Sequence, residues 1–118
     1  MRTFVIDSIS AVTHQMRGQI VVTGSHGGKS AAHLALAYPP AFVVFNDAGI
    51  GLDNAGIAGL EILQQQGVAA CTVSHVSARI GEAPSTLATG VISHTNSLAH
   101  DQGVRVDQPC VEAISFFV

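Results

Sequence analysis

Short apolar runs rich in β-branched residues, each followed by a polar or glycine-rich loop, constrain the fold of this chain most strongly. They are Gln19–Thr23, Ala41–Phe45 and Val68–Val73. Continuous apolar runs of this length are typical of strands that are covered on both faces of a sheet. We therefore predict three buried strands, with a further strand over Thr3–Val12.

Segments with helical character separate these runs. Ser30–Tyr38 is rich in Ala and Leu and is stopped by a proline pair, and a second helix is expected from near Asp53 or Asn54 to Gly67. Strands that alternate with helices form parallel sheets with helices on both faces. The sequence thus predicts an α/β fold, a compact three-layer α/β/α domain with a mostly parallel sheet, occupying residues 1–118 as one domain.

The last third of the chain is predicted from weaker signals. A proline at the start and Gly103 at the end favour one helix over about Ser85–Gln102, with an apolar stripe at helical spacing and His94 on its face. The tail Val111–Val118 is apolar and is expected to be a final strand, at an edge or against another subunit.

Composition limits the partners of the chain. The net charge is −3 and the sequence pI is near 6.0, without the basic surface that nucleic-acid binding requires. The amino terminus reaches Asp7 before a long apolar stretch develops, and the most apolar charge-free stretch is broken by Pro39–Pro40. We therefore expect neither a secretory signal nor a membrane span. Cys71 and Cys110 lack metal or CxxC spacing, so a reduced, cytoplasmic setting is expected.

Charged residues make up only 11% of the chain, against about 25% in typical domains. So few charges leave apolar surface that another copy of the chain would cover, and we predict a homo-oligomer. The small residues Ala55, Gly56 and Gly59, together with the apolar tail, are the proposed contacts. A measured solution mass of one chain at high micromolar concentration would contradict this prediction.

Polar residues are scarce, and many of them follow the predicted strands. The three loops are Thr23–Ser30, Asn46–Gly49 and Ser74–Arg79. In open α/β sheets, ligands bind outside the carboxyl ends of the strands, where the strand order reverses. If the three loops meet there, they form one site for a small anionic ligand.

The first loop is compared with the phosphate-binding pattern GxxxxGK[ST]. Gly28, Lys29 and Ser30 match its end, but Thr23 stands at its first glycine position, so the match is incomplete. A glycine loop that enters a helix can still offer backbone N–H groups to an anion. We therefore count Gly24, Gly27 and Gly28 as candidate ligand-binding residues, with a tight turn as the equally weighted alternative.

His26 is the first candidate catalytic residue, because it lies between Ser25 and two glycines with little side-chain cover. An imidazole there can act as base or acid near neutral pH. Asp47 is expected to orient it, or otherwise to cap its own loop, and Ser25 is expected to stabilise developing negative charge.

Other polar residues of these loops complete the candidate site. Asn46 and His75 are counted as ligand-binding, and Arg79 is expected to bind a substrate carboxylate unless it pairs with Glu82. No local histidine spacing supports a metal site built from the loop histidines and Asp47, so no metal is predicted, and no cofactor is assigned.

Two segments, VVTGSHGG and VVFNDAGIG, resemble the strand-His-Gly and strand-Asp-Ala-Cys segments of caspase-like cysteine peptidases. The resemblance covers two short stretches of one half of the chain. Gly49 stands where that family has its nucleophilic cysteine, so the peptidase activity is not carried over.

Three classes of function remain. The first is a small-molecule enzyme, a hydrolase or group transferase acting on an anionic or carbonyl-containing metabolite at the carboxyl ends of the strands. The second is a non-catalytic module that binds a phosphate-bearing ligand. The third is a structural or regulatory subunit of an oligomer.

Overall fold

The computed structural model describes all residues from 1 to 118 and contains one five-stranded sheet. Along the sheet the strands follow chain order, and they are β1 (Thr3–Ile6), β2 (Ile20–His26), β3 (Phe42–Asn46), β4 (Ala69–Val73) and β5 (Ile92–Thr95). The first four strands are parallel, and β5 runs antiparallel to β4. The predicted mostly parallel sheet is therefore confirmed.

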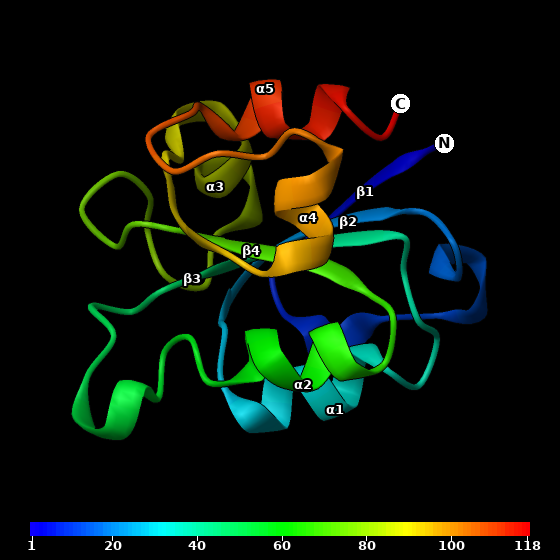
Figure 1. The fold of residues 1–118 in the computed structure, drawn as a ribbon, viewed down its shortest axis with the longest axis horizontal. Coiled ribbons are helices and arrows are strands. Elements are labelled where there is room, and N and C mark those ends of the chain that lie inside the picture. The colour runs from blue at the N-terminus through cyan, green and yellow to red at the C-terminus, as the bar shows by residue number, and fades with distance from the viewer.

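Helices cover both faces of this sheet (Figure 1). On one face lie α1 (Lys29–Ala35) and α2 (Gly59–Gln65), and on the other lie α3 (Ala83–Thr89), α4 (Ser97–Gln102) and α5 (Cys110–Ser115). The three-layer α/β/α arrangement is the one that the sequence predicts.

Alternating side chains of the central strands divide the interior into two cores. On β3, Val43 and Phe45 pack in the core beneath α1 and α2, whereas Phe42 and Val44 pack in the core beneath α4 and α5. All five residues of β3 are buried, which explains its continuous apolar pattern.

The connections place the helices. Right-handed crossovers between strands that follow one another in the same direction bring α1 and α2 to one face. Because the strand order never reverses, the sheet lacks the reversal at which a ligand crevice was expected. The chain nevertheless diverges at one place: after β3 it turns toward α2, and after β4 it turns toward α3 on the opposite face.

The predicted helix over Ser85–Gln102 is wrong. The structure has α3, then β5, then α4 in this region, and His94 therefore lies on a strand. Gly90 ends α3, and the β-branched residues of the following VISHT segment favour a strand. Pairing with β4 decides the conformation, because β5 completes the hydrogen bonding of that strand.

The predicted final strand is also wrong, since Cys110–Ser115 forms helix α5. Cys110, Ala113 and Ile114 are buried at helical spacing against the sheet, while Val111 points outward. The tail Val111–Val118 therefore does not provide the strand that was expected to pair at an edge or against another subunit.

Two further boundaries differ from the sequence prediction. β1 ends at Ile6, and short 3-10 turns at Ile9–Ala11 and His14–Met16 follow it. α2 begins at Gly59 because Asp53 and Asn54 have positive φ values of 55° and 59°, which a helix cannot contain.

Two of the three small residues proposed for an oligomer contact, Gly56 and Gly59, are buried inside the chain, whereas Ala55 is exposed. A Cβ on Gly56 would meet the Asp47 carbonyl, and one on Gly59 would meet the Gly28 carbonyl. These glycines let the β3–α2 segment approach the strand ends closely. None of the helices is long and apolar enough to cross a membrane.

Asn96 holds three elements together. Its Oδ1 accepts hydrogen bonds from the N–H groups of Ala70 (3.1 Å) and Ala99 (3.0 Å). Its Nδ2 donates to the carbonyls of Val68 (2.9 Å) and Leu60 (3.3 Å). The residue is 6% exposed, so water cannot readily replace these partners.

We predict that Asn96→Ala lowers the free energy of unfolding by about 3 kcal/mol, because buried backbone groups lose their partners. Urea denaturation measures the change. The control Gln65→Ala, which removes an exposed amide from α2, should cost less than about 0.5 kcal/mol. Equal stability of the two variants would contradict the role of Asn96.

Candidate functional site

Asp47 and His75 lie at the point where the chain diverges. Asp47 directly follows β3, and its N–H donates to the Val73 carbonyl at 2.9 Å, at the end of β4. His75 lies two residues beyond that strand. The two residues therefore lie at the carboxyl ends of adjacent parallel strands, the edge of the sheet at which α/β folds bind ligands, and the two cavities of the structure are lined by other residues.

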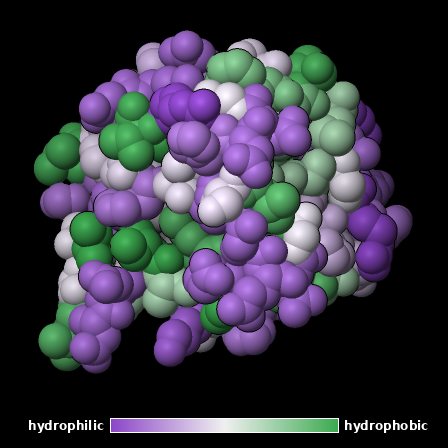
Figure 2. Space-filling model, viewed as in Figure 1, coloured by the Kyte–Doolittle hydropathy of each residue, from purple (hydrophilic) through white to green (hydrophobic).

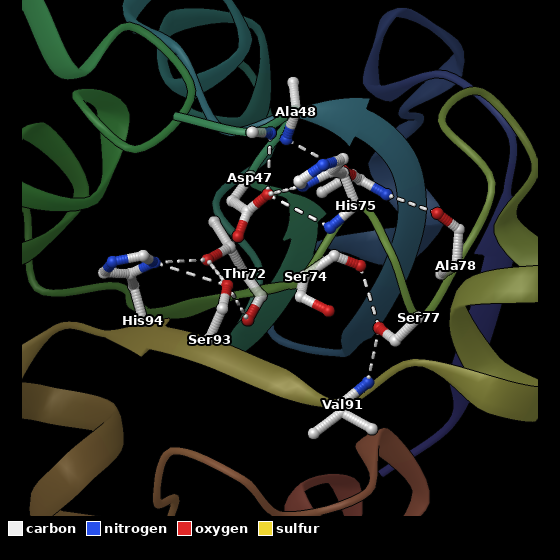
Figure 3. A network of polar contacts seen from close by, with 12 residues as sticks. Asp47, Ala48, Thr72, Ser74, His75, Ser77, Ala78, Val91, Ser93 and His94 are labelled. Carbon is white, nitrogen blue, oxygen red and sulfur yellow. Dashed lines mark hydrogen bonds and ion pairs between the residues drawn. The ribbon is translucent and has the colours of Figure 1, made fainter. Parts of the chain in front are cut away.

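The Asp47 carboxylate is nearly buried, with 5% of the residue exposed, and its Oδ1 has several partners (Figure 3). Its Oδ1 accepts hydrogen bonds from the N–H of Gly49 at 2.8 Å and from the N–H of His75 at 3.1 Å. The Nδ1 of His75 lies 3.4 Å from the same oxygen. Asp47 therefore both caps its own loop and holds the imidazole of the neighbouring loop.

The pKa of Asp47 is lowered. Burial by itself raises the pKa of this carboxyl, but the opposing contributions together outweigh it. They are the hydrogen bonds from the Gly49 N–H, the Ser93 hydroxyl and the His75 N–H, and the charge of His75. The carboxylate is thus ionised at neutral pH.

His75 is oriented on one side and open on the other. Its side chain is 50% exposed, and Gly49 lies against the ring, since a Cβ there would come within 3.5 Å of it. With Nδ1 facing Asp47, Nε2 has no partner in the protein. An imidazole held by a carboxylate through Nδ1, with Nε2 free, is the arrangement of a general base.

A second polar cluster lies beside Asp47 and was not predicted from the sequence (Figure 3). The hydroxyls of Thr72 and Ser93 are 2.9 Å apart, and the Nδ1 of His94 lies 3.3 Å from Ser93 Oγ and 3.5 Å from Thr72 Oγ1. The sequence predicts a helix over this segment, and for that reason Ser93 and His94 were not counted among the candidate site residues. The VISHT pattern between Gly90 and Asn96 is the signal that indicates a strand there.

His26 lies elsewhere. It ends β2, where it pairs in register with Asn46, and its side chain is exposed. No hydrogen bond or ion pair joins His26 to Asp47, because the carboxylate is directed at His75. Asp47 therefore orients a different histidine from the one that we expected.

Ser25 and two of the loop glycines have structural partners. Ser25 Oγ accepts a hydrogen bond from the N–H of Ile9 at 2.9 Å. The N–H of Gly24 donates to the Asp7 carbonyl and that of Gly27 to the Asn46 carbonyl, each at 3.0 Å. These amides are not free for an anion, and Gly28 is the remaining glycine that faces a pocket.

Asn46 and Arg79 differ in their surroundings. Asn46 is buried, and its Nδ2 donates to the Ala78 carbonyl at 3.1 Å while its Oδ1 accepts from the Ala48 N–H at 2.8 Å. It thereby ties the two diverging loops together. Arg79 is exposed, with its guanidinium in no ion pair with Glu82, which leaves it available to a ligand.

The structure brings together no group of three or more His, Cys, Asp or Glu side chains that could hold a metal ion. Cys71 and Cys110 are free and buried. Burial raises the pKa of the Cys110 thiol to about 12 and that of Cys71 well above its ordinary value. Both thiols are therefore protonated at neutral pH and are poor nucleophiles.

An open pocket of about 330 Å³ lies between the start of α1 and the projecting part of the β3–α2 loop, visible as a notch in Figure 2. It is lined by His26, Gly28, Lys29, Ser30, Leu52, Asp53, Ala55 and Ala58. The four non-glycine residues of this loop with positive φ are Ala48, Ile50, Asp53 and Asn54. Such strained backbone is concentrated at ligand sites and switch regions of proteins.

Comparison with known proteins identifies no relative: no protein family, no curated protein and no solved structure matches this chain. The function is therefore inferred from the geometry alone.

Proposed function

We propose that this protein is a small-molecule enzyme, a hydrolase or group transferase that acts on an anionic or carbonyl-containing metabolite. His75 is the general base of the proposed reaction, and Asp47 is the residue that orients it. The observation that carries the proposal is the ionised, nearly buried carboxylate of Asp47 at 3.4 Å from Nδ1 of a half-exposed imidazole.

The proposed reaction follows from these contacts. Nε2 of His75 takes the proton of a water molecule or an acceptor hydroxyl as its oxygen attacks the electrophilic carbon or phosphorus of the substrate. The imidazolium that forms is stabilised by the Asp47 carboxylate. The proton then passes from Nε2 to the leaving group, which returns the histidine to its neutral form.

Arg79 is the proposed anchor for the negative charge of the substrate. Its guanidinium is exposed, and it stands four residues after His75 in the same loop. A planar guanidinium binds carboxylate or phosphate through two parallel hydrogen bonds. His26 is placed outside this reaction, because it does not contact Asp47.

We predict that His75→Gln lowers turnover by at least about a hundredfold, since the general base is lost. The measurement is release of nitrophenol from a panel of p-nitrophenyl esters with neutral and carboxylate-bearing acyl groups, and from p-nitrophenyl phosphate. The control is His14→Gln, which removes an exposed histidine that stacks edge-on with Tyr38, far along the chain from the site. Equal turnover by wild type and His75→Gln would exclude the proposed base.

The second candidate is a non-catalytic module that binds a phosphate-bearing ligand. The observation that favours it is the position of the pocket, which is lined by His26, Lys29 and Ser30 rather than by His75. Lys29 is the only lysine of the chain, and an ammonium is a common phosphate ligand.

If the protein binds such a ligand there, pyrophosphate or a nucleoside diphosphate will raise the melting temperature of wild type without being consumed. A ligand at a hundred times its Kd stabilises by about 2.7 kcal/mol. Lys29→Gln should abolish the shift, whereas Arg2→Gln, which removes a cation lying over Phe4 at the start of β1, should retain it. A shift that persists in Lys29→Gln would exclude this pocket as the phosphate site.

Two wider proposals concern the oligomeric state and the cellular setting of the protein. The homo-oligomer is supported by the low charge content and by the exposed apolar side chains of Val111, Phe116 and Val118 in and after α5. A cytoplasmic setting is supported by the two unpaired cysteines.

A further inference from the structure

The two edges of the sheet differ in how the chain covers them. At β5 the outer edge is paired, because the Ile92 N–H donates to the Gln108 carbonyl and the Ile92 carbonyl accepts from the Asp107 N–H, each at 2.8 Å. β1 is the outermost strand on the opposite side, and β2 is the only strand with which it pairs. Open strand edges pair readily with another strand, and proteins commonly block them with lysine, proline or a β-bulge. The TFVI sequence of β1 has no lysine or proline, and its pairing with β2 is regular.

The free backbone groups on this edge belong to Thr3 and Val5. Alternate residues of a strand face the same neighbour, and the Arg2 carbonyl accepts from the Ile20 N–H at 3.0 Å, so the even-numbered residues of β1 face β2. The N–H and C=O groups of Thr3 and Val5 therefore point away from β2, and no other group of the chain bonds to them. Both residues are exposed, which leaves these groups open to a partner strand.

We propose that this edge pairs with β1 of a second copy of the chain, antiparallel and about a two-fold axis at Phe4, so that the two sheets become continuous. In this register Thr3 exchanges both hydrogen bonds with the partner's Val5, and Val5 does the same with the partner's Thr3. All the open backbone groups are then paired. A register centred on Val5 would instead set Thr3 opposite the partner's Asp7, whose carbonyl already accepts from the Gly24 N–H.

The charges at the two ends of β1 favour a second copy as the occupant of this edge. Arg2 and Asp7 have opposite signs, and neither forms an ion pair within the chain. The Asp7 carboxylate accepts one N–H, from Ala83 at 2.9 Å through Oδ1, and its other oxygen remains free. The proposed register sets Arg2 opposite the partner's Ile6 and next to the partner's Asp7. A parallel copy in register would set Arg2 beside the partner's Arg2, which like charges oppose.

The side chains of the strand are compatible with the same register. Val5 is 41% exposed, and Phe4 is half-buried, with the Arg2 guanidinium carbon 4.9 Å from the centre of its ring. Phe4 faces the partner's Phe4 on one side of the sheet, and Thr3 faces the partner's Val5 on the other. Cross-strand aromatic pairs stabilise antiparallel strands, and β-branched residues pack well on a pleated surface. The inference rests on the homo-oligomer proposed above, to which it gives a defined interface, and it is independent of the enzyme function.

The first measurements are the solution mass by sedimentation equilibrium and the hydrogen exchange of the β1 amides by NMR. At high micromolar concentration, wild type should have twice the mass of the 12.2 kDa chain. The amides of Thr3 and Val5 should be protected from exchange in the dimer and should lose this protection on dilution to the monomer. The amides of Phe4 and Ile6 face β2 and should stay protected at every concentration.

The test variant is Val5→Pro. It removes the outward N–H of residue 5 and no hydrogen bond to β2, and proline is tolerated where the N–H of an edge strand faces outward. One interchain hydrogen bond is lost on each side of the axis, so the dissociation constant of the dimer should rise at least about tenfold. Val5→Ala keeps the N–H and should raise that constant less. Val111→Ser removes an exposed apolar side chain from α5 and should leave it unchanged.

Three results would overturn the inference. A monomeric wild type at high micromolar concentration removes both the β1 interface and the homo-oligomer. A dimer in which the Thr3 and Val5 amides exchange freely, or one that dissociates in Val111→Ser but not in folded Val5→Pro, removes the β1 interface and leaves the homo-oligomer standing. The exchange pattern of wild type decides the interface even if Val5→Pro does not fold. Because no turnover is measured, a failure of the proposed enzyme function does not affect the outcome.

Discussion

Parallel pairing of β3 with β4 is the constraint from which the rest of the structure follows. Both strands are wholly buried, so their backbone groups must pair within the sheet and both of their faces must be covered. In this chain, the segment after β3 leads to α2 on one face and the segment after β4 leads to α3 on the other. Polar residues that follow these strands then meet in the gap between the departing loops.

The Asp47 carboxylate shows how this gap is stabilised. A charge with so little exposure is tolerable only when hydrogen bonds replace its water. Backbone N–H groups on both sides of the gap, from Gly49 and His75, supply that replacement. The same bonds fix the direction of the carboxylate, so the structural requirement and the orientation of the imidazole have one cause. The side chain of Asn46 also joins the two loops, because it hydrogen-bonds to the Ala48 N–H and to the Ala78 carbonyl.

Two separate groups of polar residues lie at the carboxyl edge of the sheet. One is the Asp47–His75 pair with the Ser93 cluster, and the other is the pocket at the start of α1. The strained β3–α2 loop belongs to both, because its first residues hold His75 and its far part lines the pocket.

The sequence by itself determined the buried strands β2 to β4, the helices α1 and α2 after two of them, and the position of Asp47 and His75 at strand ends. These features depend on local periodicity and on turn residues, which are visible in one stretch of chain. The sequence prediction was wrong for β5, which it placed in a helix, and for α5, which it placed in a strand. These two elements, an edge strand and a short helix, take their conformation from the elements on which they pack. Only the tertiary structure decided which histidine Asp47 holds and which hydroxyls lie beside it. Those pairings join residues far apart in sequence, and a contact across the sheet leaves no pattern in either segment alone.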